Sequence, residues 1–413
     1  MNQALYKTYA EVVVRIGCAL QKGQKLTISA PVECAAFARA LAEAAFLHGA
    51  PDVEIYWNDE QVSRLRYLYG EQARVCSLPG YLREQRMAAL QEGAAYVAIS
   101  AEDPDAYAGV DPNVVQRARI ATRTALKPYF EAMNNNVLQW CIASVPTQAW
   151  ANKVFPNEAD PVGALWKAIA HAVRLDEPDP IAAWQAHIQR LNRRMEKLNA
   201  LRLSALHYRS QNGTDLTVGL AREHIWCGGA DMAAKNGASF IANMPTEEVF
   251  TTPDRLRVEG VVKNALPLVY NGAVIDGFSL TFREGRVERF SAAQGEAALG
   301  ALLDTDEGAR YLGEAALVSA DSPIAQMGVL FYNTLFDENA ACHLALGSSY
   351  PSCIQGGAEL PEESLRSRGG NTSLLHADFM IGTEDLSIEG LLPNGLRLPI
   401  FQNGVWAGEF LEP

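Results

Sequence analysis

Residues 23–57 read GQKLTISAPVECAAFARALAEAAFLHGAPDVEIYW, and this stretch decides the fold of the first half of the chain. Residues 23–31 form a short β-like run, residues 32–48 are rich in alanine with helical spacing, and residues 51–57 are β-like again. Gly49 follows the helix as a C-cap glycine does. The sequence therefore predicts a strand–helix–strand unit in a parallel sheet, because the crossover between parallel strands has to carry a helix.

The same alternation continues on both sides of this unit. Residues 3–22 have helical spacing, residues 94–100 form a β-like run, residues 112–133 are helical, and residues 137–146 are β-like. We therefore predict an α/β domain over residues 1–180 with an open, mostly parallel sheet. Neither G-x-G-x-x-G nor G-x-x-x-x-G-K-[ST] occurs, so a structural or substrate-binding use of this domain is favoured over a nucleotide site.

A break at residues 176–180, DEPDP, ends this pattern, and a long helix is predicted over residues 181–200. After the helix the chain changes to alternating β-like runs separated by turn dipeptides. The turn signals are Asn212–Gly213, Asn271–Gly272 and Glu284–Gly285. Such turns predict hairpins. We expect a second, α+β domain over residues 181–413 that is rich in antiparallel strands, with helices near 294–310 and 322–335.

The bulk composition fits a globular protein and excludes some partners. The chain has 413 residues, which predicts two or three domains, and 48% of them are hydrophobic. Its net charge of −13 argues against a protein that binds nucleic acid through clustered Lys and Arg. No apolar run approaches the roughly 20 residues that span a bilayer, and the N-terminus lacks the layout of a signal peptide.

The seven cysteines are scattered and odd in number, and no C-x-x-C occurs. This pattern predicts neither a disulfide framework nor a thiolate zinc site, and it favours a reduced cytoplasmic location.

The second half contains a group of metal-ligand residue types. Five carboxylates and imidazoles lie there in short clusters: Glu248, Glu314, His343, His376 and Asp378. Residues of these types bind catalytic transition metals, and the set exceeds what one structural zinc needs. We therefore predict a candidate two-metal hydrolase whose site lies in the second domain.

Each of these residues also has a structural interpretation when it is taken alone. His376 and Asp378 point to one face of a predicted strand, but a loop histidine and an aspartate paired with arginine fit the same pattern. Glu248 follows Glu247 in an apolar stretch, where an unpaired buried carboxylate is costly, although an exposed acidic turn also fits.

The other two of these residues, and Tyr350 beside them, remain open in the same way. Glu314 at the start of a buried strand also fits a surface cap, and His343 between apolar neighbours also fits a satisfied core histidine. Tyr350 follows a Gly/Ser loop, where its hydroxyl would either donate to an oxyanion or pack.

Together these segments resemble the M29 metallo-aminopeptidase family, also called the aminopeptidase T / aminopeptidase S family. The matching strings are NMPTEEVFTTP at 243–253, the GE and ALV at 313–318, HLALG at 343–347 and HADFMIG at 376–382. Their order agrees with the family as well. The N-terminal strings LQKGQKLTISAP and HGA match too, so the resemblance covers most of the chain.

The resemblance implies the roles of the site residues. It places metal ligands at Glu248, Glu314, His343, His376 and Asp378, and the active-site tyrosine at Tyr350. It further implies a homodimer with two divalent metal ions in the C-terminal domain, commonly zinc or cobalt. Ligand type by itself does not choose among zinc, cobalt and manganese.

These implications predict an aminopeptidase that releases N-terminal amino acids from peptides by means of a water activated by two metals. In this hypothesis Tyr350 donates to the developing oxyanion and Glu247 is a candidate general base. Two alternatives stay open: a metal-dependent hydrolase of other small amides or esters, and a dimer that binds a ligand without catalysis.

Overall fold

The computed structural model describes residues 3–270 and 273–411, and the chain forms two compact units. The first unit contains Met1–Gln185 and Ala230–Pro245, and the second contains Ala186–Gly229 and Thr246–Pro413. The division therefore lies within one long helix, and the first unit includes a segment far along the chain. The predicted domains, residues 1–180 and 181–413, follow chain order and place residues 230–245 in the second domain.

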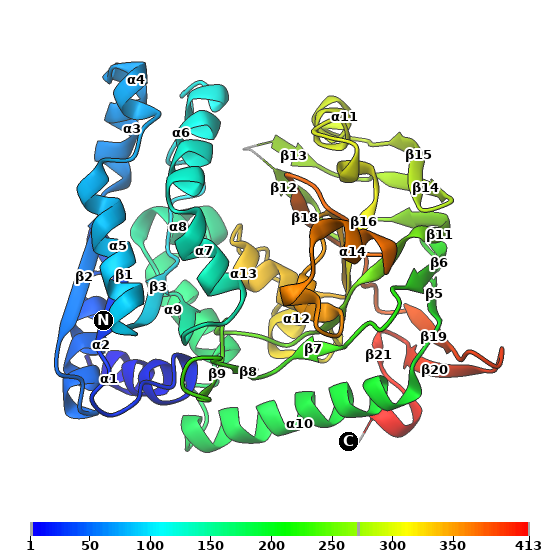
Figure 1. Ribbon diagram of the computed structural model, residues 1–413, viewed down its shortest axis with the longest axis horizontal. Coiled ribbons are helices and arrows are strands. Elements are labelled where there is room, and N and C mark those ends of the chain that lie inside the picture. Colours follow the sequence, from blue (N-terminus) through cyan, green and yellow to red (C-terminus); the bar gives the residue numbers. More distant parts are fainter. Residues whose placement is uncertain (1–2, 271–272, 412–413) are drawn as a thin grey trace. The chain divides into compact units, whose positions relative to one another are not determined.

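The first unit is built on a four-stranded sheet with strand order β2-β1-β3-β4 (Figure 1). Its strands are β1 (Leu26–Pro31), β2 (Val53–Asn58), β3 (Ala95–Ile99) and β4 (Trp140–Ala143). All three pairings are parallel, which confirms the open parallel sheet predicted for this half of the chain.

Helices precede, connect and follow these strands. They are α1 (Gln3–Val12), η1 (Val13–Gly17), η2 (Val32–Cys34), α2 (Ala35–Leu47), α3 (Glu60–Tyr69), α4 (Gln72–Val75), α5 (Gly80–Glu92), α6 (Pro112–Ala125), α7 (Lys127–Asn134), α8 (Gln148–Val154) and α9 (Pro161–Ala172). The segment from the later part of the chain adds the short pair β8 (Asp231–Met232) and β9 (Ser239–Phe240).

Two predicted helices are interrupted in the structure. The helix predicted over 3–22 changes at Val13 into the π-helical turn η1, and Ala19 has a φ of 40°. The helix predicted over 112–133 divides into α6 and α7 at Leu126. Pro128 lies in the first turn of α7, where its missing N–H costs nothing, whereas it would break the interior of a single helix.

The helix α10 (Pro180–Leu201) follows the predicted break. The Asp179 carboxylate accepts hydrogen bonds from the N–H groups of Ile181 and Ala182, which satisfies the free donors of the first turn. The helix predicted over 181–200 is therefore confirmed.

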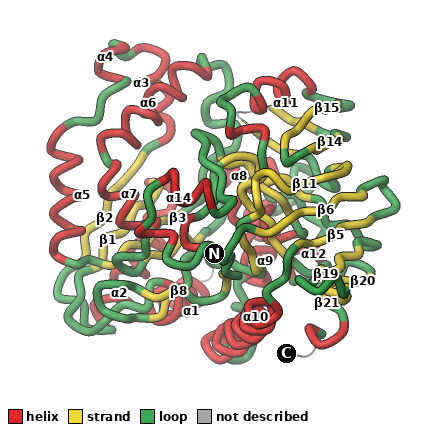
Figure 2. The backbone as a smooth tube through the Cα atoms, turned by 45° about the vertical axis from the view of Figure 1, so that its right-hand side comes forward, coloured by secondary structure: helices red, strands yellow, loops and turns green. Residues whose placement is uncertain are grey.

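The second unit contains two antiparallel sheets. The five-stranded sheet has the order β18-β17-β16-β10-β7, with β7 (Cys227–Gly228), β10 (Val249–Thr251), β16 (Leu312–Leu317), β17 (His343–Gly347) and β18 (His376–Met380). The eight-stranded sheet has the order β15-β14-β11-β6-β5-β19-β20-β21 (Figure 2). Its strands are β5 (Ala205–Arg209), β6 (Asp215–Leu220), β11 (Pro253–Lys263), β14 (Ser279–Arg283), β15 (Arg286–Ser291), β19 (Ser387–Leu391), β20 (Arg397–Gln402) and β21 (Val405–Trp406).

Shorter elements complete this unit. They are the pair β12 (Leu268–Tyr270) and β13 (Ala273–Ile275), and α11 (Glu296–Leu303), η3 (Gly308–Arg310), α12 (Pro323–Met327), α13 (Thr334–Asp337), η4 (Glu338–Ala340), η5 (Pro351–Cys353), η6 (Gly357–Glu359), α14 (Glu362–Ser367) and η7 (Gly408–Phe410). The helices near 294–310 and 322–335 are thus present in shorter form.

The predicted turns are explained by backbone conformation. Glu284 and Gly285 join β14 to β15 and both have positive φ, 47° and 81°, as a two-residue hairpin turn requires. Gly213 lies between β5 and β6 with a φ of 100°. The predicted turn Asn271–Gly272 lies outside the described residues.

One apolar core is shared by the two sheets of this unit. It contains Leu216 and Val218 of the eight-stranded sheet together with Leu312, Leu344 and Phe379 of the five-stranded sheet. The opposite face of the five-stranded sheet is therefore left for polar side chains. No helix in the described part of the chain is long and apolar enough to cross a bilayer.

Candidate metal centre

The register of the five-stranded sheet places the predicted ligands on one face. Asp378 pairs with Ala345, and Ala345 pairs with Glu314, so these three side chains lie in one row across the sheet. His343 and His376 lie two residues from members of that row and share its face, because side chains alternate along a strand. Glu248, next to the pair formed by Val249 and Leu317, points to this face as well.

A β-bulge at Gly313 turns Glu314 toward that face. The register shifts between Leu312 and Glu314, so Leu312 points into the core while Glu314 points to the site. In a regular strand, these two residues would share a face. A Cβ at position 313 would collide with the carbonyl oxygens of Gly347 and Ser348, so the bulge requires glycine.

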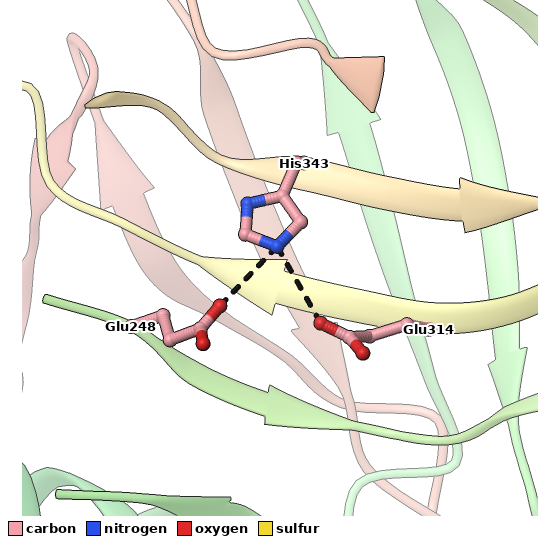
Figure 3. A group of neighbouring side chains, drawn as sticks. All are labelled: Glu248, Glu314 and His343. Atoms are coloured by element: carbon pink, nitrogen blue, oxygen red, sulfur yellow. Dashed lines mark ion pairs between the residues drawn. The ribbon is translucent and has the colours of Figure 1, made fainter. Parts of the chain in front are cut away.

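The first group of ligand types centres on His343 (Figure 3). Its Nε2 lies 3.2 Å from Oε2 of Glu248 and 3.4 Å from Oε1 of Glu314. All three residues are buried, and their ligand atoms lie close enough together to hold one ion.

The second group shares Glu314 with the first. His376 Nε2 lies 3.6 Å from Oε2 of Glu314 and 3.3 Å from Oδ1 of Asp378. Glu314 thus presents one oxygen to each group. The structure brings all five residues together in two groups that meet at this carboxylate.

Backbone carbonyls orient both imidazoles. Nδ1 of His343 lies 3.1 Å from the oxygen of Ala341, and Nδ1 of His376 lies 2.8 Å from the oxygen of Ser348. A carbonyl oxygen only accepts, so in each ring Nδ1 carries the proton and donates. A neutral ring held in this way directs the lone pair of Nε2 toward the carboxylates, as metal-ligating histidines do.

The donor set fits divalent cations. Oε2 of Glu248 is buried and has no hydrogen-bond partner among the described residues, although Nε2 of His343 is nearby. An unsatisfied buried carboxylate is costly unless a cation compensates it. Burial by itself lowers the pKa of His343, but Glu248 and Glu314 raise it well above its ordinary value. Positive charge therefore stabilises the carboxylates of this group, and bound cations would supply it.

A fourth carboxylate lies near this cluster. Burial, and then the charges of Glu248 and Asp378, raise the pKa of Glu338 well above its ordinary value. The residue lies at the start of η4, five positions before His343. Its sequence context, DENAA, resembles a surface turn, so sequence reasoning did not select it. With Glu338 the cluster would carry four negative charges, equal to the charge of two divalent ions.

Tyr350 lies beside the cluster. Its ring centroid is 4.9 Å from that of His376 and 5.9 Å from that of Phe250. Surrounding protein, and then the charges of Glu314 and Asp378, raise the pKa of the Tyr350 hydroxyl well above its ordinary value, although the residue is 42% exposed. Tyr350 therefore keeps its proton at neutral pH and can donate a hydrogen bond.

Glu247 has a different environment from its neighbour Glu248. Its Oε2 lies 3.6 Å from Nε2 of His187 on α10, and its backbone N–H donates to the side chain of Asn339. His187 also contacts the carbonyl oxygen of Thr246 at 2.8 Å. These contacts hold the segment that carries Glu248 against α10 and favour a structural role for Glu247. The alternative role of Glu247, as a general base, stays a prediction.

Replacing Glu247 with glutamine separates the two roles. We expect kcat to stay within about threefold of wild type and the melting temperature to fall by a few degrees, because the contact with His187 would weaken while the cluster keeps its ligands. Steady-state kinetics and thermal unfolding on the same preparation measure this. A fall in kcat of more than 10²-fold with unchanged metal content would instead establish the general base.

Known proteins are similar to this chain over nearly its whole length. A sequence model of the family described as thermophilic metalloprotease (M29) matches residues 2–406. Aminopeptidase 2 of Geobacillus stearothermophilus is 46% identical over 404 residues, which cover 97% of each chain. Aminopeptidase T of Thermus thermophilus is 44% identical over 399 residues, covering 96% of this chain and 97% of that protein. A solved structure of wild-type AmpT from Thermus thermophilus has a TM-score of 0.92 and covers 98% of this chain and 100% of that one.

Proposed function

Because this chain belongs to the M29 family of metalloproteases, we propose that it is an aminopeptidase that releases N-terminal amino acids from peptides with the help of two divalent ions. One observation carries the two-metal part of the proposal: Glu314 is shared by two groups of ligand types on one sheet face. The relatives are named aminopeptidases, which supports the choice of peptides with a free N-terminus as substrates.

In this proposal Glu248, Glu314 and His343 would hold one ion, and Glu314, His376 and Asp378 would hold the other. Glu338 lies near enough for its charge to interact with Glu248 and Asp378, so it would help to balance the charge of the ions. The ligand types suit zinc, cobalt or manganese. The family resemblance also supports a homodimer, which sedimentation of the purified protein would test.

When bound, two such ions lower the pKa of a water and polarise a scissile carbonyl. The side chains of the protein supply the remaining functions. Tyr350, held against the ring of His376, donates its hydroxyl proton toward the oxygen of the carbonyl as negative charge develops there. Small side chains at Ala316 and Ala345 on the same sheet face leave room between the ligands.

Replacing Tyr350 with phenylalanine tests the donor role. The change keeps the ring that packs against His376 and removes only the hydroxyl, so we expect kcat to fall on the order of 10²–10³-fold with little change in KM. Metal content, measured on the same sample, should stay at the wild-type value. Unchanged kcat would show that the ring of Tyr350 only packs.

A pair of peptides tests the substrate class. An aminopeptidase requires the free amino group, so a tripeptide should be cleaved at its first bond while its N-acetylated form should be cleaved at least about 10²-fold more slowly. Mass spectrometry of the products identifies the bond that is broken. Equal rates on the two peptides would favour the alternative, a metal-dependent hydrolase of other small amides or esters.

A further inference from the structure

A cavity opens beside the candidate metal centre along strand β18. Its volume is about 210 Å³, and it lies between β18, β12 and the segment that joins α12 to α13. His376 and Asp378 form part of its wall, so the cavity borders the second group of ligand types.

We propose that this cavity holds the side chain of the first residue of the substrate, and that the enzyme therefore prefers apolar N-terminal residues of the size of leucine to phenylalanine. The inference rests on the proposed aminopeptidase function. The first side chain branches from the carbon next to the scissile carbonyl, so it must lie within a few ångströms of the ligands. The cavity meets this condition, because His376 and Asp378 line it.

The lining of the cavity is mostly apolar. Leu268 and Tyr270 of β12 face it together with Leu330 and Met380, and the first three of these are only partly buried. Filling the cavity with an apolar side chain would remove the remaining apolar surface from water, which is worth roughly 25 cal/mol per Å². A polar or charged side chain would gain less from these apolar walls.

Apart from the ligand groups, the lining has one acidic side chain, and its carboxylate already accepts hydrogen bonds from the backbone. The carboxylate of Asp337 accepts hydrogen bonds from the N–H groups of Phe331 and Asn333, at 2.7 and 2.9 Å. Burial, opposed by these donors, raises the pKa of Asp337 to about 7. Asp337 therefore shapes the segment that bears Leu330 and does not offer a free anion to a lysine or arginine side chain.

The size of the cavity sets an upper bound on the side chain. An apolar cavity of roughly 150 Å³ accepts a benzene ring. A volume of about 210 Å³ thus accommodates leucine, methionine or phenylalanine with little empty space. Alanine would leave most of the cavity unfilled.

A series of aminoacyl amides with one common leaving group tests the preference. With the wild-type, metal-loaded enzyme we expect kcat/KM for leucyl and phenylalanyl amides to exceed that for the alanyl amide by on the order of 10²-fold, and that for arginyl and glutamyl amides by at least about tenfold. A flat profile, or arginine as the best first residue, would overturn the inference while leaving the aminopeptidase function intact. Hydrolysis of none of the amides or free peptides would refute the proposed function itself.

Two matched variants locate the preference in the cavity. Leu330→Trp fills the cavity from a loop segment, so the ratio of kcat/KM for phenylalanyl to alanyl amide should fall at least about tenfold. Leu396→Trp makes the same substitution at an exposed position between β19 and β20, outside the cavity lining, and should leave that ratio unchanged. The proposal is contradicted if kcat/KM in Leu330→Trp falls equally for the phenylalanyl and alanyl amides. It is also contradicted if the preference follows the second residue of dipeptides. The wild-type amide series decides the question even if Leu330→Trp does not fold.

Discussion

Replacing Glu314 with glutamine is expected to lower kcat/KM by at least about 10³-fold and to reduce the bound metal to one equivalent or less. The carboxylate presents one oxygen to His343, at 3.4 Å, and the other to His376, at 3.6 Å. Glutamine has a similar shape but carries no charge, and its nitrogen cannot act as a ligand. A loss of several kcal/mol of charge stabilisation corresponds to this fall in rate.

The matched control is Glu389→Gln in the same unit. Glu389 lies on β19, where it pairs with Arg397 at 2.9 Å. This variant should keep wild-type metal content and a kcat/KM within about threefold. Elemental analysis and steady-state kinetics on both variants give the comparison. Wild-type metal content in Glu314→Gln would show that Glu314 is not a ligand shared by the two ions.

Removing the metal from the wild-type protein should abolish activity and lower the melting temperature by roughly 10 °C. Without cations the carboxylates of Glu248, Glu314 and Asp378 face one another in a buried site, which favours unfolding. An ion present at about a thousand times its dissociation constant stabilises the folded state by roughly 4 kcal/mol, and each kcal/mol shifts the melting temperature of a unit of this size by about 2–4 °C.

Calorimetry of the chelated and the reloaded protein measures this shift. Activity and melting temperature should return together when zinc, cobalt or manganese is added back. A chelated protein with full activity and an unchanged melting temperature would rule out a resident metal.

The candidate ligands could be selected from the sequence because flanking strings resemble a known family, and the local pattern would not have been enough. His343 lies in a run of apolar residues and looks like a core histidine. Only the pairing of Ala316 with His343 and of Ala345 with Glu314 brings the ring to the carboxylates, and strand register is a long-range property. The bulge at Gly313 was likewise invisible, although the glycine that permits it stands in the sequence.

Other features depended on contacts that no local signal carries. Glu338 joins the cluster through the short turn η4, while its acidic neighbours suggest a surface position. Residues 230–245 belong to the first unit although they follow α10. By contrast, the split between α6 and α7 had a local signal in Pro128, which the helical periodicity around it concealed.

The most direct test of the two-metal site is a crystal structure of the metal-loaded protein with anomalous scattering recorded for the ion. Two peaks about 3.5–4 Å apart are expected. One should lie about 2.0–2.2 Å from Glu248, Glu314 and His343, and the other at the same distance from Glu314, His376 and Asp378. A single peak, or two peaks of which only one contacts Glu314, would contradict the proposed two-metal site.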